Sequence, residues 1–288
     1  MRWQMGRRSS NIEDRRGGGF GRGARIGGGV GGIGIVVVAL IAMFLGVDPS
    51  IVLQNLPQDQ PSPAPSGPVR ASPEEERLKE FVSVVLADTE DTWNEIFGQM
   101  GQSYQEPRLV LFRDSVQSAC GYAGAAVGPF YCPGDQRVYL DLSFFDELSR
   151  RFGAPGEFAR AYVIAHEVGH HVQTLLGISR EVRAAQASTD QATANALSVR
   201  MELQADCLAG LWAHHAQRAR QILEPGDVEA ALGAASAIGD DRLQRRTQGE
   251  VVPESFTHGS SAQRVRWFQT GLEQGSLQRC DTFNADRV

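Results

Sequence analysis

Cysteine is scarce in this chain, with four residues among 288 and no pair spaced as C-x-x-C. The lack of that spacing argues against a structural zinc site built from thiolates. An even number of cysteines in an oxidising compartment favours disulfides, with free buried thiols as the alternative. Four cysteines permit three connectivities. We expect Cys120 to pair with Cys132 across a Gly-rich loop, and Cys207 to pair with Cys280.

The chain also lacks an excess of positive charge, because its formal net charge is −6 at pH 7. Residues 1–25 hold seven arginines and two acidic residues, a charge of +5, which leaves −11 on the remainder. A basic start on an acidic protein indicates membrane topology and argues against nucleic acid as a partner. We also find no internal repeat, which excludes repeat architectures.

Residues 26–47 contain no charged side chain, and their second half is strongly apolar. As a helix, this stretch is long enough to span a hydrocarbon core. The preceding arginines predict a single transmembrane helix with the N-terminus in the cytoplasm and the rest of the chain outside. A cleaved signal peptide is the alternative, but no good small-residue cleavage site follows Val47.

The chain therefore divides into a basic cytoplasmic stretch (1–25), a membrane helix (26–47), a Pro-rich linker (48–73) and one folded domain (74–288). Periodicity predicts a helix from Pro73 to about Gly101 and helices after Pro155. It also predicts short strands at Leu109–Phe112 and Val138–Leu142, and a short helix at Phe144–Arg151. The second strand is a candidate exposed edge for pairing with a peptide. The expected class is α+β.

The most informative motif is His166-Glu167-Val168-Gly169-His170, inside an apolar run that reads as a helix from Glu157 to Gly177. Residues i and i+4 share one face of a helix, so both imidazoles can reach one metal ion. Glu167 lies beside the first histidine, where it can act on a metal-bound water. The alternative is a buried helix with two hydrogen-bonded histidines. Burying these polar groups without partners is costly, which favours the metal.

A catalytic zinc needs three protein ligands and an open position. The pattern H-E-x-x-H-x-x-G-x-x-H fails here, because Gln173 and Leu176 stand where glycine and histidine are required. A later helical segment offers Glu202 and Asp206 at i and i+4. Glu202 can ligate the metal, and Asp206 can accept a hydrogen bond from the outer nitrogen of a ligating histidine. A solvated helix face is the alternative interpretation of this pair.

The other histidines are weaker candidates. His171 points about 100° away from His170 around the helix. His214 and His215 do not return to the face of Glu202. His258 precedes a glycine and two serines, where it can serve as an oxyanion donor or as an ordinary loop histidine.

Several segments together resemble a bacterial family of neutral zinc metallopeptidases, and the resemblance covers essentially the whole chain. The matching segments are Ser118–Gly121, Gly128–Pro133, Val138–Phe145, Ala165–Gln173, Glu202–Cys207 and His258–Phe268. The resemblance implies a mostly helical, zincin-like domain, of the type with a glutamate as third ligand, with a small sheet before the H-E-x-x-H helix. It says little about substrates.

These observations predict a membrane-anchored zinc endopeptidase acting on peptides or proteins, with its domain in the periplasm or outside the cell. His166, His170 and Glu202 would hold one Zn²⁺, and Glu167 would act as general base. His258 or Tyr139 would stabilise the oxyanion. The alternative is a zinc-bearing envelope scaffold that binds peptides without hydrolysis. The intact Glu167 argues against it, because a scaffold needs no general base.

Overall fold

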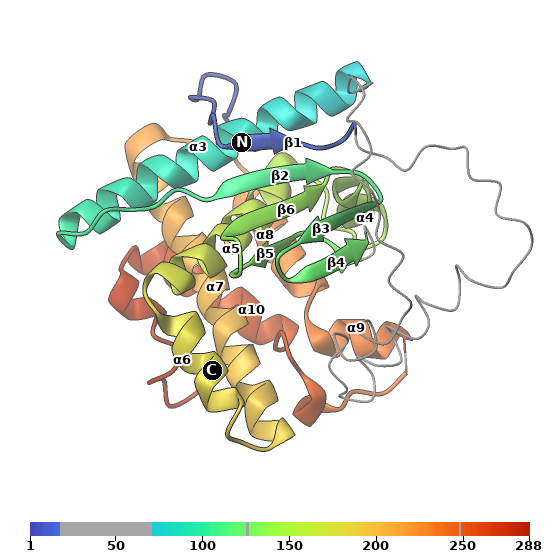
Figure 1. Ribbon diagram of the computed structural model, residues 1–288, viewed down its shortest axis with the longest axis vertical. Coiled ribbons are helices and arrows are strands. Elements are labelled where there is room, and N and C mark those ends of the chain that lie inside the picture. The colour runs from blue at the N-terminus through green and yellow to red at the C-terminus, as the bar shows by residue number, and fades with distance from the viewer. Residues whose placement is uncertain (18–70, 125–126, 248) are drawn as a thin grey trace, which may run out of the picture.

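The computed structural model describes residues 1–17, 71–124, 127–247 and 249–288 (Figure 1). The predicted membrane helix, 26–47, and nearly all of the predicted linker lie outside these residues. Among the helices of the described ranges, none combines the length and apolarity that a bilayer crossing requires.

A small mixed sheet lies on one side of the helices, with the strand order β1-β2-β6-β5. Its strands are β1 (Ile12–Asp14), β2 (Arg108–Phe112), β6 (Arg137–Asp141) and β5 (Phe130–Cys132). β1 and β6 both run parallel to β2, whereas β5 is antiparallel to β6. The hairpin β3 (Ser115–Ser118) and β4 (Gly121–Gly124) lies beside the sheet. The two predicted strands are confirmed.

The predicted edge strand is wrong, because β6 is flanked on both sides by β2 and β5. The two edges are β1 and β5. β5 has only three residues and lies between Pro129 and Pro133. Such a short strand between prolines gives no alternating pattern from which to predict it. After β5, the chain turns back at Gln136, whose φ is 56°, and continues as β6, which pairs with β5.

Residues 1–17, which we name the N-terminal arm, fold onto the domain beside α3 (Pro73–Gln99) and β2 (Figure 1). Trp3 is 4% exposed and packs edge-on against Phe81 of α3, with ring centroids 5.4 Å apart. The expected boundary between a basic N-terminal stretch and a domain beginning at residue 74 therefore differs from the structure. The prediction of a separate basic stretch rested on net charge, which does not show whether arginines are solvated or paired. Arg16, for example, is paired with carboxylates in the fold.

The helix α3 begins where its sequence predicts. Ser72 accepts a hydrogen bond from the backbone N–H of Glu75, and the Glu75 side chain accepts one from Ser72, which forms a capping box. The predicted short helix is also present as α4 (Phe144–Arg150). Both elements pack onto the core through aromatic residues, with Phe81 and Phe145 edge to face at 6.4 Å.

The rest of the chain is helical, as predicted. The elements are α5 (Glu157–Leu175), α6 (Ile178–Gln186), α7 (Gln191–Arg220), α8 (Asp227–Ala237), α9 (Asp240–Thr247), η2 (Pro253–Ser255), α10 (Ser261–Gln274) and η3 (Leu277–Cys280). Breaks fall at Gly177 and Gly226, where φ is 83° and 89°, the left-handed conformation that glycine tolerates. α5 lies between the sheet and the long helix α7 (Figure 1).

Both predicted disulfides are confirmed. Cys120, in the turn between β3 and β4, is bonded to Cys132 of β5. Cys207 of α7 is bonded to Cys280 of η3. The second bond ties the C-terminal end of the chain to the helix that carries Glu202.

Candidate active site

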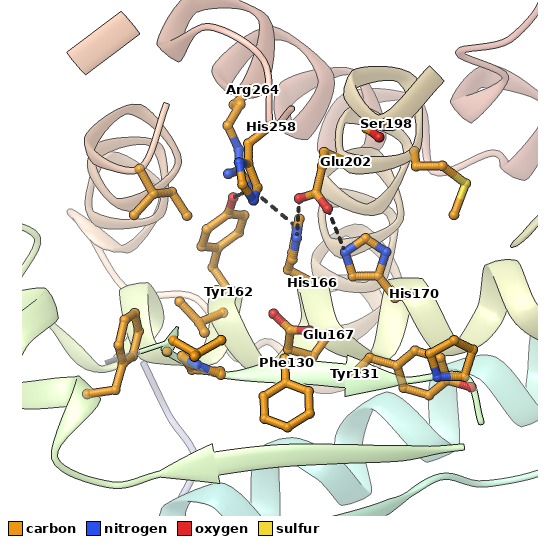
Figure 2. A pocket seen from close by; sticks show the side chains of 18 of the residues that line it. Phe130, Tyr131, Tyr162, His166, Glu167, His170, Ser198, Glu202, His258 and Arg264 are labelled. Atoms are coloured by element: carbon orange, nitrogen blue, oxygen red, sulfur yellow. Dashed lines mark hydrogen bonds and ion pairs between the residues drawn. The ribbon is translucent and has the colours of Figure 1, made fainter. Parts of the chain in front are cut away.

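Two helices bring His166, His170 and Glu202 to one point (Figure 2). Nε2 of His166 lies 3.2 Å from Oε2 of Glu202, and Nε2 of His170 lies 3.3 Å from Oε1. The donor atoms of the three residues all lie within 4.8 Å of one another. Two imidazole nitrogens and one carboxylate form a donor set of catalytic zinc sites, with room for a fourth ligand. The residues therefore fit a zinc ion.

Gly169 explains how the two helices come so close. A Cβ atom at this position would lie 3.0 Å from the backbone oxygen of Ala205 on α7. The glycine in the middle of H-E-V-G-H thus lets α7 approach α5 at the level of the site. Glu202 lies three residues before Ala205, on the same segment of α7.

The outer nitrogens of both histidines have fixed partners. Nδ1 of His166 lies 2.9 Å from Oδ1 of Asp206, as the E-x-x-x-D spacing predicts. Nδ1 of His170 lies 2.8 Å from Oε1 of Gln173, a partner that the sequence analysis missed. Gln173 is fully buried, and its Nε2 donates to the backbone oxygen of Met201 at 2.7 Å. These contacts place the proton on each Nδ1 and leave each Nε2 free to bind a metal. The spacing of three residues between His170 and Gln173 was the available signal.

Asp206 is itself held by a buried network. Nε of Arg264 donates to Oδ2 at 2.9 Å, Nη2 of Arg264 donates to Oδ1 at 3.0 Å, and the Tyr162 hydroxyl also donates to Oδ1. Burial raises the pKa of Asp206, but the charges of Arg264 and His166 outweigh it and hold the pKa below its usual value. Asp206 therefore faces His166 as a carboxylate. Arg264 and Tyr162 were not predicted as site residues.

Glu167 lies on the opposite side of His166 from Glu202 (Figure 2). Its side chain is buried and lines the cleft. Burial raises its pKa, and the positive charge of the nearby histidines only partly offsets this. A carboxylate with a raised pKa is a better proton acceptor, which suits a general base.

His258 lines the same cleft, and its side chain is 52% exposed. Its Nδ1 lies 3.2 Å from Oδ1 of Asp240, the first residue of α9. The other carboxylate oxygen, Oδ2, accepts hydrogen bonds from the backbone N–H groups of Thr257, His258 and Gly259. Asp240 thus fixes both the loop and the ring. It was missed because an aspartate 18 residues earlier carries no local signal for this contact.

Tyr139, the other predicted oxyanion donor, lies away from the site. It is buried in a small cluster with Val110 and Phe112, and its hydroxyl donates to Asp135 at 2.7 Å. Its neighbours Val138 and Leu140 belong instead to the main core. Successive side chains of a strand point to opposite faces, so Tyr139 is on the face that does not carry the main core.

The remaining histidines of the described residues have other partners. His171 contacts the Tyr131 hydroxyl and the backbone oxygen of Gln105. His214 and His215 contact the backbone oxygens of Leu272 and Gly275. These contacts agree with the expectation that none of the three belongs to the metal group.

The cleft above the metal group has a volume of about 680 Å³. One wall is β5, an edge of the sheet, whose residues Phe130 and Tyr131 are among those that line the cleft. Many other lining residues are apolar: Val127, Phe144, Phe152, Val163, Ile238 and Leu243. The site thus combines a metal-binding group, a buried base and a largely apolar groove beside a strand edge.

A helix-borne H-E-x-x-H pair, completed by a glutamate from a second helix, defines a zincin-type metallopeptidase site. The chain belongs to the family described as "Putative neutral zinc metallopeptidase", whose model matches residues 1–283.

Two relatives illustrate the extent of the similarity. The uncharacterized protein YpfJ of Escherichia coli K12 is 51% identical over 98% of this chain and 99% of its own length. The uncharacterized protein Rv2575 of Mycobacterium tuberculosis H37Rv is 43% identical over 85% of each chain. No solved structure matches the chain.

Proposed function

We propose that this protein is a zinc-dependent endopeptidase. The observation that carries the proposal is the convergence of His166, His170 and Glu202 on one point, with the buried carboxylate of Glu167 beside them. These three residues would hold the zinc ion. When bound, zinc would lower the pKa of a water and polarise the scissile carbonyl.

The protein's own groups have separate tasks. Glu167 accepts the proton of the attacking water and passes it to the leaving amine nitrogen, for which its raised pKa suits it. His258 donates a hydrogen bond to the oxygen that gains negative charge at the scissile carbonyl. Asp206 and Gln173 keep both ligand imidazoles in the tautomer that presents Nε2.

The edge of β5 supports a peptide substrate in extended form. Among the described residues only β6 pairs with β5, so the other side of β5 can accept an additional strand. Such pairing holds a segment of chain through its backbone and needs no free terminus, which favours cleavage of internal bonds. The apolar residues of the cleft favour an apolar side chain next to the scissile bond.

We also propose that residues 26–47 attach the protein to a membrane and that the catalytic domain lies in the periplasm or outside the cell. The two disulfides support an oxidising compartment.

The decisive experiment compares Glu167→Gln with wild type in the full-length protein. Zinc content should be unchanged, because Glu167 is not a ligand. Hydrolysis of unfolded casein should fall by roughly 10²- to 10⁴-fold, the contribution typical of a general base. Glu147→Gln, the same change at another glutamate of the cleft, is the control and should retain activity.

Two outcomes would contradict the proposal. Undiminished casein cleavage by Glu167→Gln would show that Glu167 is not the general base. Stoichiometric zinc in a wild-type protein that turns over no peptide would favour the non-hydrolytic scaffold.

A further inference from the structure

The N-terminal arm is part of the domain's sheet and core. β1 pairs with β2 from Ile12 opposite Leu109 to Asp14 opposite Leu111. Backbone hydrogen bonds extend this pairing on both sides, to Asn11 at 2.9 Å and to Arg15 at 2.7 Å. The arm therefore covers a sheet edge that would otherwise present unpaired N–H and C=O groups.

A buried carboxylate on α3 depends on the arm. The side chain of Glu90 is fully buried. Three arm residues donate to it: Arg7 through Nη2 at 2.8 Å, Ser9 through Oγ, and Asn11 through Nδ2 at 2.9 Å. A buried charge without partners is strongly destabilising, so the domain is built to receive the arm.

The arginines of the arm are partners of the domain. Arg16 is fully buried, and its Nη2 lies 2.6 Å from Oε1 of Glu76 on α3 and 2.7 Å from Oδ2 of Asp14. Glu13 of the arm accepts a hydrogen bond from Arg137 of β6 at 3.1 Å. Arginines such as Arg16, whose charge predicted a cytoplasmic N-terminus, are thus paired with carboxylates of the folded domain. The family match also includes the arm, since it begins at residue 1.

We infer that the N-terminal arm lies in the same compartment as the active site. Residues 1–17 and the residues from 71 onward pack into one folded domain, so both parts lie on the same side of any membrane. A single crossing would separate the arm from β2 and α3 and leave Glu90 without its donors. The packing of the arm therefore outweighs the bias of positive charge towards the cytoplasm. This inference does not rest on the proposed peptidase activity.

Cysteine labelling of the full-length protein tests the inference. All four native cysteines are in disulfides, so an introduced cysteine is the only free thiol. Met5→Cys reports on the arm, because Met5 is 99% exposed. Ser103→Cys reports on the catalytic domain, at an exposed position after α3. A membrane-impermeant maleimide is added to bacterial spheroplasts before and after lysis.

We expect both cysteines to be labelled to the same extent before lysis. Labelling of both only after lysis also upholds a shared compartment, while it contradicts the proposed outward location of the domain. Labelling of Ser103→Cys before lysis and of Met5→Cys only after lysis would overturn the inference.

Thermal unfolding of the purified full-length protein gives an independent measurement. Trp3→Ala should lower the Tm by roughly 6 to 12 °C, because it removes a buried aromatic side chain from the core. Met5→Ala changes an exposed residue of the same arm and should leave the Tm unchanged. Equal Tm values for the two variants would show that the arm does not pack on the domain. Neither measurement depends on hydrolysis, so failure of the proposed function leaves this test intact.

Discussion

Oδ1 of Asp206 lies 2.9 Å from Nδ1 of His166, on the side of the imidazole opposite to Glu202. One turn of α7 therefore supplies both a metal-binding carboxylate and the carboxylate that orients a metal-binding histidine. The arrangement follows from the spacing of four residues between Glu202 and Asp206, which places both on one face of the helix.

The first prediction concerns this orienting contact. Asp206→Asn should lower zinc affinity by roughly 10- to 100-fold, because the amide cannot stabilise the Nδ1 proton as a carboxylate does. Competition with a chelator measures the affinity. Asp286→Asn, an exposed aspartate near the C-terminus, is the control and should bind zinc as wild type does. An unchanged zinc affinity in Asp206→Asn would show that the Asp206 carboxylate does not orient His166 for metal binding.

The second prediction concerns the partner of His170. Gln173→Leu has no acceptor for Nδ1–H, so zinc affinity should fall on the order of tenfold. Gln173→Glu restores an oxygen acceptor and should bind zinc more tightly than Gln173→Leu, although it loses the donor to the Met201 backbone oxygen. The same chelator competition applies. If both variants bind zinc equally, hydrogen bonding from Gln173 does not orient His170.

The parts of the site that could be read from sequence are those set by helix periodicity. His166 and His170, like Glu202 and Asp206, are four residues apart, and a helix places such pairs together whatever the tertiary fold. The disulfides were also readable, because few connectivities exist for four cysteines. In both cases, the residues that lie together could be predicted by choosing among a few alternatives.

The missed features depend on contacts between distant segments. Arg264 reaches Asp206 across 58 residues, and Asp240 reaches His258 from the start of another helix. The edge position of β5 depends on strand order, which no single strand encodes. Gln173 was near in sequence, but its role depends on burial of its amide against α7. Local pattern therefore predicted the metal group and not its supporting network.

The third prediction concerns the crossing of α7 and α10, the helices that carry Glu202 and Arg264. A Cβ atom at Gly271 would lie 1.9 Å from the backbone oxygen of Cys207, so an alanine there forces the helices apart. Gly271→Ala should reduce the free energy of unfolding by about 3 kcal/mol. Urea denaturation measures the change.

A second glycine provides the matched control for this change. Gly233 lies within α8, and a Cβ atom there meets nothing within 4 Å. Gly233→Ala should stabilise the protein by about 0.5 to 1 kcal/mol, because alanine favours the helix. Equal effects of the two substitutions would show that the helices do not cross closely at Gly271.

The fourth prediction concerns pH. The His258 side chain is half-exposed, so partial desolvation in the cleft lowers its pKa less than the carboxylates of Asp240 and Glu202 raise it, and the pKa lies above the ordinary value of 6.5. As the doubly protonated imidazolium, His258 donates through Nδ1 to Asp240 and through Nε2 to the oxyanion at the same time. A neutral ring that keeps its proton on Nδ1 for Asp240 has no donor at Nε2. Activity should therefore be lost as pH rises through the raised pKa, which places the alkaline limb of kcat/KM above pH 6.5.

Asp240→Asn removes a carboxylate that raises this pKa, so the alkaline limb should move to lower pH while zinc content stays unchanged. His258→Gln should lack the limb and lower kcat by roughly 10²- to 10³-fold, the cost of one oxyanion donor. The measurement is kcat/KM against pH for the three proteins. An alkaline limb at the same pH in wild type and Asp240→Asn would show that it belongs to another group, because only the ionisation of His258 depends on Asp240 in this way.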